Sequence, residues 1–136
     1  MFVVNNFLIC FLGLKKVTIL LLDSNPHLNI IEPKAFVGLT SLQKLNISSA
    51  NVNLLRENVF LNMSSLRTLE FKSNKLQAID KGAFNELTSL TSLDLRGNKI
   101  EKTSKDMFYG LNSLKYLYTD NFKFCCLASS LVPFER

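Results

Sequence analysis

The sequence has no tryptophan, a single histidine and only three cysteines among its 136 residues, and these scarcities limit the chemistry open to it. With His27 as the only imidazole, a Ser-His triad and a multi-histidine metal site both lack their parts. No G-x-S-x-G turn, glycine-rich phosphate loop or C-x-x-C pair occurs either. We therefore expect a protein that is not an enzyme and that uses no metal and no cofactor.

Long hydrophobic runs are also missing. The longest nearly unbroken apolar stretches are residues 7–14 and 17–22, which are much shorter than the roughly 20 apolar residues of a membrane-spanning helix. The first stretch could be the core of a secretory signal, but "MFVVNN" before it has no Lys or Arg, and no small-x-small cleavage site follows clearly. We expect no transmembrane segment in this chain.

A strongly charged surface of one sign is likewise absent. Sixteen Lys and Arg residues outnumber eleven Asp and Glu residues, which gives a net charge of +5. The basic residues are spread singly apart from the pair Lys15-Lys16, so they form no stripe that could follow a phosphate backbone. We therefore expect no nucleic-acid partner.

What the sequence does have is an internal repeat. Segments that begin at Leu42, Leu66 and Leu90 align at a period of 24 residues with the pattern L-x-x-L-x-L-x-x-N-x-L, and a segment from Val17 adds one residue at Pro26-His27. This is the pattern of a leucine-rich repeat. It predicts four repeats, then a last strand with a truncated, cysteine-containing C-terminal cap: 17–41, 42–65, 66–89, 90–113 and 114–136.

Residues 1–16 allow two interpretations. The phrase "FLGLKK" at 11–16 matches "FVGLTS" and "FYGLNS", which close later repeats. That match favours a partial leading repeat, because an independent signal peptide has no reason to end in repeat phase. The alternative is the weak signal-like segment described above.

The spacing predicts an α/β leucine-rich-repeat solenoid. In "LTSLDLRGN" at 90–98, Leu93 and Leu95 alternate with polar residues, so a short strand sends the leucines into the core and the polar side chains outward. Parallel strands then build a curved sheet on the concave face, and the convex side is irregular or made of short helices. Asn98 lies where the chain leaves the strand, where its amide can satisfy unpaired backbone groups.

Two further positions of the repeat are a recurring phenylalanine and the turn asparagine. A phenylalanine recurs every 24 residues, and its repeat phase indicates core packing rather than an aromatic binding surface. In the second repeat Ala50 occupies the Asn position and Asn51 follows it, so either the turn is rebuilt locally or Asn51 takes the place. The recurring phenylalanines are Phe36, Phe60, Phe84 and Phe108.

The candidate ligand-binding residues lie on the concave face. Glu70 and Asp94 fall at equivalent positions of neighbouring strands, where like charges are unfavourable unless a cation relieves them. A ligand arginine would bridge the two carboxylates; alternatively, Lys72 and Arg96 on the same strands neutralise them. Two tyrosines, a common anchor at interfaces, follow toward the C-terminus. The candidate set, which predicts a peptide or protein ligand with basic residues, is Glu70, Asp94, Lys72, Arg96, Tyr116 and Tyr118.

Two N-x-S triplets agree with an extracellular location. They begin at Asn46 and Asn62. Asn46 is predicted to project from the concave sheet, where a glycan would crowd the binding surface. Asn62 is predicted on the convex side, so we expect it to be the glycosylated residue.

The three cysteines do not pair with one another in such a solenoid. Cys10 lies four to five repeats from Cys125, which is at least about 20 Å at the strand spacing, whereas a disulfide needs its Cα atoms within about 7 Å. Cys125 and Cys126 are adjacent, and adjacent cysteines seldom bond without distorting the backbone. We therefore expect their partners to lie beyond Arg136.

The C-terminal run "LKYLYTDNFKFCCLASSLVPFER" at 114–136 resembles the repeat cap of leucine-rich-repeat G-protein-coupled receptors, above all their relaxin-receptor-like and invertebrate branch. The resemblance implies disulfides from Cys125 and Cys126 to a hinge that precedes a membrane domain in the full-length protein. It implies an insulin-like or relaxin-like hormone on the concave face, with arginines held by acidic residues, by position Glu70 and Asp94. It also implies a location on the extracellular face of the plasma membrane.

Only the C-terminal run discriminates among families, since the repeats are shared with other extracellular proteins, Toll-like receptors included. The chain has no low-density-lipoprotein module, no hinge cysteine and no seven-helix bundle. We therefore expect a C-terminal fragment of the receptor's repeat domain. The alternative is a freestanding or single-span extracellular repeat protein for adhesion or innate immune recognition.

Overall fold

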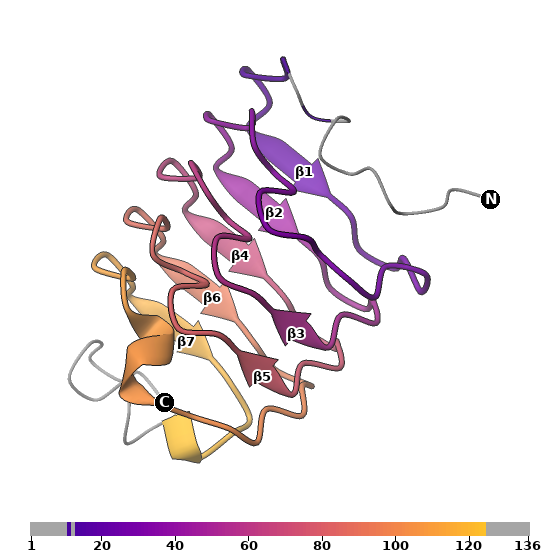
Figure 1. The fold of residues 1–136 in the computed structure, drawn as a ribbon, viewed down its shortest axis with the longest axis vertical. Helices are drawn as coiled ribbons and strands as arrows, with labels where there is room; N and C mark the ends of the chain where they lie inside the picture. Colours follow the sequence, from indigo (N-terminus) through magenta and orange to yellow (C-terminus); the bar gives the residue numbers. More distant parts are fainter. Residues whose placement is uncertain (1–10, 12, 125–136) are drawn as a thin grey trace.

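Short parallel strands lie across the molecule and stack one after another along its length (Figure 1). The structure is a computed structural model that describes residue 11 and residues 13–124. Five strands form the main sheet in the order β1-β2-β4-β6-β7, and β3 and β5 form a second, two-stranded sheet. The elements are β1 (Ile19–Leu21), β2 (Lys44–Asn46), β3 (Leu54–Leu55), β4 (Thr68–Glu70), β5 (Ala78–Ile79), β6 (Ser92–Asp94), the 3-10 helix η1 (Lys105–Phe108) and β7 (Tyr116–Tyr118).

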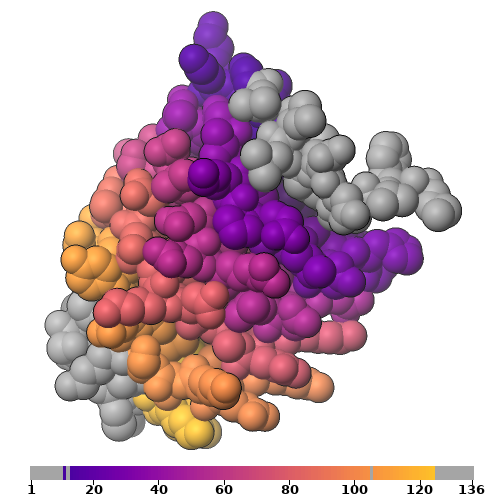
Figure 2. All heavy atoms as spheres, viewed as in Figure 1, coloured from indigo at the N-terminus to yellow at the C-terminus, as the bar shows by residue number. Residues whose placement is uncertain are grey.

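The register of the main sheet follows the sequence repeat. Lys44 pairs with Thr68, Thr68 with Ser92 and Ser92 with Tyr116, so each step from β2 onward advances 24 positions. Ile19 of β1 pairs with Lys44, a step of 25 positions. In the space-filling view the repeats accordingly appear as successive bands from indigo to yellow (Figure 2). The predicted leucine-rich-repeat solenoid is confirmed.

The core lies between the two sheets and repeats from rung to rung. The middle leucine of each central strand is fully buried, and behind these leucines the phenylalanines stack. The ring centroids of Phe36 and Phe60 are 5.9 Å apart with 7° between the ring planes, and those of Phe60 and Phe84 are 6.1 Å apart. Phe11 extends the stack one rung earlier, 6.1 Å from Phe36. The predicted phenylalanine core is confirmed, with Phe11 as a member that the sequence pattern did not single out.

The turn asparagines satisfy backbone groups from two rungs at once. The side-chain amide of Asn74 donates to the carbonyl oxygens of Ile47, at 2.7 Å, and Phe71, at 3.3 Å. Its Oδ1 accepts the N–H of Val52 at 3.2 Å. Asn98 makes the corresponding three contacts one rung later. Their predicted structural role is confirmed.

The turn of the second repeat is rebuilt locally, which was one of the two expected outcomes. Ala50 occupies the buried position with 6% of its surface exposed. Asn51 does not take that position. Its side-chain amide instead donates to the carbonyl oxygen of Pro26, at 2.6 Å, in the preceding repeat.

The convex side is more regular than the sequence predicted. Its two-stranded sheet pairs Leu54 with Ala78 and Leu55 with Ile79. Leu55 and Ile79 are buried while Leu54 and Ala78 are half-buried, which is the two-residue alternation of a strand. Strands this short carry too little alternation to be recognised in the sequence. Among the described residues, no helix is long and apolar enough to cross a membrane.

Candidate ligand-binding surface

The concave face is the outer face of the main sheet. The middle leucine of each three-residue strand points inward, so the residues on either side of it point outward. In β4 and β6 these outward residues are half-buried. In β7 they are Tyr116 and Tyr118, with 46% and 45% of their surface exposed. The face therefore becomes aromatic and open toward its C-terminal end.

The two acidic candidates lie side by side, and both are already ion-paired. Glu70 and Asp94 are register partners on β4 and β6. The Nζ of Lys44 lies 2.6 Å from an Oε1 of Glu70, and the Nη2 of Arg96 lies 2.6 Å from the Oδ2 of Asp94. The proposed neutralisation by basic residues thus holds for Arg96, whereas Glu70 pairs with Lys44 rather than with Lys72.

The Arg96–Asp94 ion pair is made through two hydrogen bonds. The guanidinium donates through Nε to Oδ1 at 3.0 Å as well as through Nη2 to Oδ2, so the pair is bidentate. The hydrogen bond to Asp94, reinforced by the carboxylate's charge, raises the pKa of Arg96 above the ordinary arginine value. The same guanidinium lies 5.2 Å from the ring centroid of Tyr118, within the range of a cation-π contact. These contacts hold one side of the Tyr118 ring in place.

Two further charged residues border this group. The Oδ2 of Asp120 accepts the backbone N–H of Gly97 at 2.8 Å, which fixes the carboxylate beside the turn. Lys72 is exposed, and within the described part of the chain no carboxylate forms a salt bridge with it. Because Glu70 and Asp94 are both paired, Lys72 is a charge on this face that remains open to an incoming ligand.

Sequence reasoning missed Lys44 as a site residue and missed the contact of Arg96 with Tyr118. Lys44 lies one strand before Glu70 and two positions before Asn46, the register partner of Glu70, which is a diagonal within reach of a long side chain. The 24-residue alignment of the repeats already implied this diagonal relation. Which of two nearby lysines would pair with Glu70, however, depends on side-chain conformation.

The two sequons lie in different settings. Asn62 is exposed and has φ of 65°, in the left-handed region where Gly38 and Gly110 have φ of 106° and 96° at equivalent places in their repeats. Asn46 lies in β2, half-buried, and its Oδ1 accepts the N–H of Ser48 at 2.9 Å. Cys10, Cys125 and Cys126 lie outside the described residues. No group of three or more His, Cys, Asp or Glu side chains suited to a metal ion occurs in the part of the chain that the structure describes.

Repeat, register and core together define the class of protein. The family described as "Leucine rich repeat" matches residues 9–52, 41–100 and 64–121, which is most of the chain. The chain therefore belongs to the leucine-rich-repeat family. Such domains are typically protein-interaction modules that bind through the extended surface of the solenoid.

A solved structure gives a more particular likeness. The chain is similar to the one described as the crystal structure of the TLR13-ssRNA13 complex, with a TM-score of 0.66 and 28% sequence identity. The alignment covers 75% of this chain but 15% of that one, so this chain spans a small part of its neighbour's length. No curated protein matches the chain. The domain is thus a leucine-rich-repeat interaction domain similar to part of a Toll-like-receptor ectodomain.

Proposed function

We propose that this chain is the ligand-binding part of an extracellular receptor, and that a peptide or protein ligand binds the C-terminal half of its concave face. The observation that carries the proposal is a cluster of Tyr116, Tyr118 and the Arg96–Asp94 pair, in which two half-exposed tyrosines lie beside a bidentate ion pair. We call it the tyrosine cluster. Tyrosine and arginine are among the residues that most often dominate binding energy at protein interfaces.

Within this class we propose a G-protein-coupled hormone receptor with an insulin-like or relaxin-like ligand. The support is the resemblance of residues 114–136 to the cap of that receptor family, together with the adjacent carboxylates of Glu70 and Asp94. A ligand arginine that reaches Asp94 has to compete with Arg96, which already occupies both carboxylate oxygens. The strength of that internal pair therefore sets the affinity for a basic ligand.

This competition predicts that two kinds of substitution change the ligand affinity in opposite directions. A labelled relaxin-like peptide is titrated against the chain and its variants. The double variant Glu70→Lys with Asp94→Lys should lower affinity at least tenfold, because two repulsive charges replace two attractive ones. Arg96→Gln should raise affinity, because it frees Asp94. Lys75→Gln, at an exposed lysine outside the strands, is the control and should leave the affinity unchanged.

The results also show whether the ligand contacts Arg96 or the two carboxylates. If Arg96→Gln weakens binding of the peptide, Arg96 itself contacts the ligand, and the carboxylates do not hold ligand arginines. If the charge-reversed double variant binds the peptide as well as the unaltered chain does, the hormone reading fails.

An innate immune receptor is the second candidate, supported by the likeness to TLR13, whose solved structure is a complex with ssRNA13. That likeness makes nucleic acid a candidate ligand again, although the lack of a basic stripe in the sequence had led us to expect none. Tyrosine rings can stack on unpaired bases while Arg96 and Lys72 meet phosphates. A short single-stranded RNA should then bind with an affinity that falls steeply with salt, and Tyr118→Ala should weaken it about tenfold. RNA binding that does not respond to Tyr118→Ala would rule out this surface.

A further inference from the structure

Three lysines that are isolated in the sequence stand in a column in the fold. Lys75, Lys99 and Lys123 are 24 residues apart, and each lies on the turn that follows a strand of the main sheet, after β4, β6 and β7 respectively. All three are exposed. We call them the lysine column. Because the stacking of repeats brings them together, a search of the sequence for basic runs does not find them.

Hydrogen bonds between the rungs hold these turns in register. The N–H of Lys99 donates to the carbonyl oxygen of Leu76 in the rung before it, at 2.9 Å. One rung later, the side-chain amide of Asn121 donates to the carbonyl oxygen of Ile100 at 2.7 Å. The Oδ1 of Asn121 accepts the N–H of Lys123 at 3.0 Å. Successive turns are therefore about one strand spacing apart, roughly 4.8 Å.

The charge of the column is not neutralised by the chain. Among the described residues, no carboxylate forms a salt bridge with the three lysines or with Lys72, which is exposed on the same turn as Lys75. Glu101, two residues after Lys99, forms no salt bridge with it. The carboxylate of Asp120 is engaged with the N–H of Gly97. Like charges on neighbouring rungs repel one another, and a bound polyanion relieves that repulsion.

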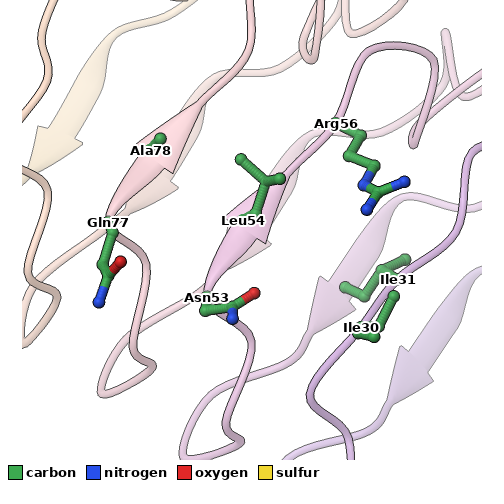
Figure 3. A pocket seen from close by; sticks show the side chains of 7 residues that line it. All are labelled: Ile30, Ile31, Asn53, Leu54, Arg56, Gln77 and Ala78. Carbon is green, nitrogen blue, oxygen red and sulfur yellow. The ribbon is translucent and has the colours of Figure 1, made fainter.

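An exposed arginine on the convex side provides the contrast. Arg56 lies beyond the end of β3, beside a pocket of about 400 Å³ that is lined partly by aliphatic side chains (Figure 3). In the described part of the chain it also forms no salt bridge. Its counterparts one rung before and one rung after are Glu32 and Asp80, which are both exposed. Charges therefore alternate in sign there, whereas the lysine column has one sign.

We propose that the lysine column, with Lys72 beside it, binds a linear sulfated polysaccharide. Sulfate groups along the polysaccharide meet ammonium groups on successive turns. An ammonium group is a compact charge with three rotatable donors, so it adapts to a sulfate without the planar fork that arginine needs. Exposed charges of one sign also raise the local concentration of such a polyanion before it binds.

The surroundings of the column favour a polysaccharide over other polyanions. The turn positions between the cations of the first two rungs carry polar side chains or none, and they are Ser73, Asn74, Gly97 and Asn98. These positions offer no ring on which a nucleic-acid base could stack and no apolar side chain that could enter a membrane. An aromatic residue occurs only beside the last lysine, where Phe122 is 87% exposed among the described residues.

This surface is separate from the tyrosine cluster. The lysine column is on the turns, whereas Tyr116 and Tyr118 point outward from a strand of the main sheet. The polysaccharide as a natural partner rests on the extracellular location proposed above, but its binding in solution does not. Lys75→Gln should weaken polysaccharide binding and leave the affinity for the relaxin-like peptide unchanged. A failure of one proposal is therefore distinguishable from a failure of the other.

The test measures binding of a fluorescein-labelled heparin decasaccharide to the full chain by fluorescence polarisation at several salt concentrations. The triple variant Lys75→Gln, Lys99→Gln and Lys123→Gln should lower the affinity about tenfold and make it less dependent on salt, because fewer exposed ion contacts form. The same decasaccharide without its sulfates should not bind. Far-UV circular dichroism checks that the variant, whose altered side chains are all exposed, keeps its fold.

A second triple variant is the control for net charge. Lys15→Gln, Arg56→Gln and Arg67→Gln also lower the net charge from +5 to +2, but at exposed positions spread over the molecule. This variant should bind the decasaccharide nearly as tightly as the unaltered chain. Equal losses of affinity in the two triple variants would mean that net charge alone attracts heparin, and would overturn the proposal.

Phe122→Ala separates the polysaccharide from the other polyanions. It should leave heparin binding unchanged, because sulfate recognition by lysines needs no ring. A single-stranded RNA, or vesicles containing phosphatidylserine, that bind more tightly than heparin and lose that binding in Phe122→Ala would identify a nucleic acid or a membrane as the partner instead. Undiminished heparin binding by the lysine triple variant would also overturn the proposal.

Discussion

The buried layer of this solenoid repeats one residue type from rung to rung, whereas the outward positions of its concave face change at every rung. Phenylalanine stacks on phenylalanine through the interior at ring separations of 5.9 to 6.1 Å. On the concave face, the position that is Asn46 in β2 becomes Glu70, then Asp94, then Tyr118. The first series is periodic and the second is not.

The difference separates what holds the fold from what selects a partner. A buried position meets the same neighbours in every repeat, so one side-chain shape suits all rungs. An outward position meets solvent or a ligand, and each rung is free to differ. Substitutions in the buried series should therefore alter stability strongly and those in the outward series weakly.

The largest contrast is expected between Phe84 and Tyr116. Phe84 is fully buried within the stack, so Phe84→Ala should lower the free energy of unfolding by about 3 to 5 kcal/mol. Tyr116 is 46% exposed, and Tyr116→Ala should lower it by about 0.5 kcal/mol or less. Urea unfolding of both variants measures the two values. Comparable losses would mean that Tyr116 belongs to the core and would break the comparison.

A second contrast uses two glycines with left-handed backbone. Gly110 has φ of 96°, and an added Cβ would lie 2.6 Å from the Cα of Asn85 and 2.8 Å from the carbonyl oxygen of Phe84. Gly13 has φ of 93° but nothing within 4 Å. Gly110→Ala combines backbone strain with overpacking and should cost about 3 kcal/mol, whereas Gly13→Ala should cost about 1 kcal/mol. Equal melting temperatures of the two variants in thermal unfolding would contradict this prediction.

The third contrast concerns the turn asparagines. Asn74→Ala would leave the buried carbonyl of Ile47 and the N–H of Val52 without this partner, at a cost of about 1 to 3 kcal/mol. Asn25 is exposed, and its amide donates to the carbonyl of Leu22 at 2.7 Å, where water can replace it. Asn25→Ala should cost about 0.5 kcal/mol. Urea unfolding of Asn74→Ser, which keeps a hydroxyl but cannot span both rungs, should resemble that of Asn74→Ala.

Sequence patterns predicted the periodic features and missed features that depend on local fit. The 24-residue period located the stacked phenylalanines and the turn asparagine Asn98, because burial demands the same side chain in each rung. It did not predict that Lys44 rather than Lys72 pairs with Glu70, because both lysines are long enough and only their conformations decide. The β3–β5 sheet was also missed, since backbone pairing between short segments leaves almost no pattern of residue types.

The smallest expected effect on stability is that of a substitution at Asn62. This position combines a structural role in a turn with a predicted surface role as a glycosylation site. Asn62 takes the left-handed turn conformation that Gly38 and Gly110 take in other repeats. Asn62→Gly should therefore remove the glycan while changing the free energy of unfolding by about 0.5 kcal/mol or less. Asn62→Gln also removes the glycan but should cost about 1 kcal/mol through backbone strain.

Mass spectrometry of the chain secreted from eukaryotic cells measures occupancy, with Ser64→Ala as a control that removes the sequon and keeps Asn62. We expect one glycan, on Asn62, because Asn46 is half-buried in β2 and its side-chain oxygen is engaged with the N–H of Ser48. A glycan on Asn46 would stand on the concave face one strand from Glu70. It would then obstruct the centre of that face and confine any protein ligand to the tyrosine cluster at its C-terminal end.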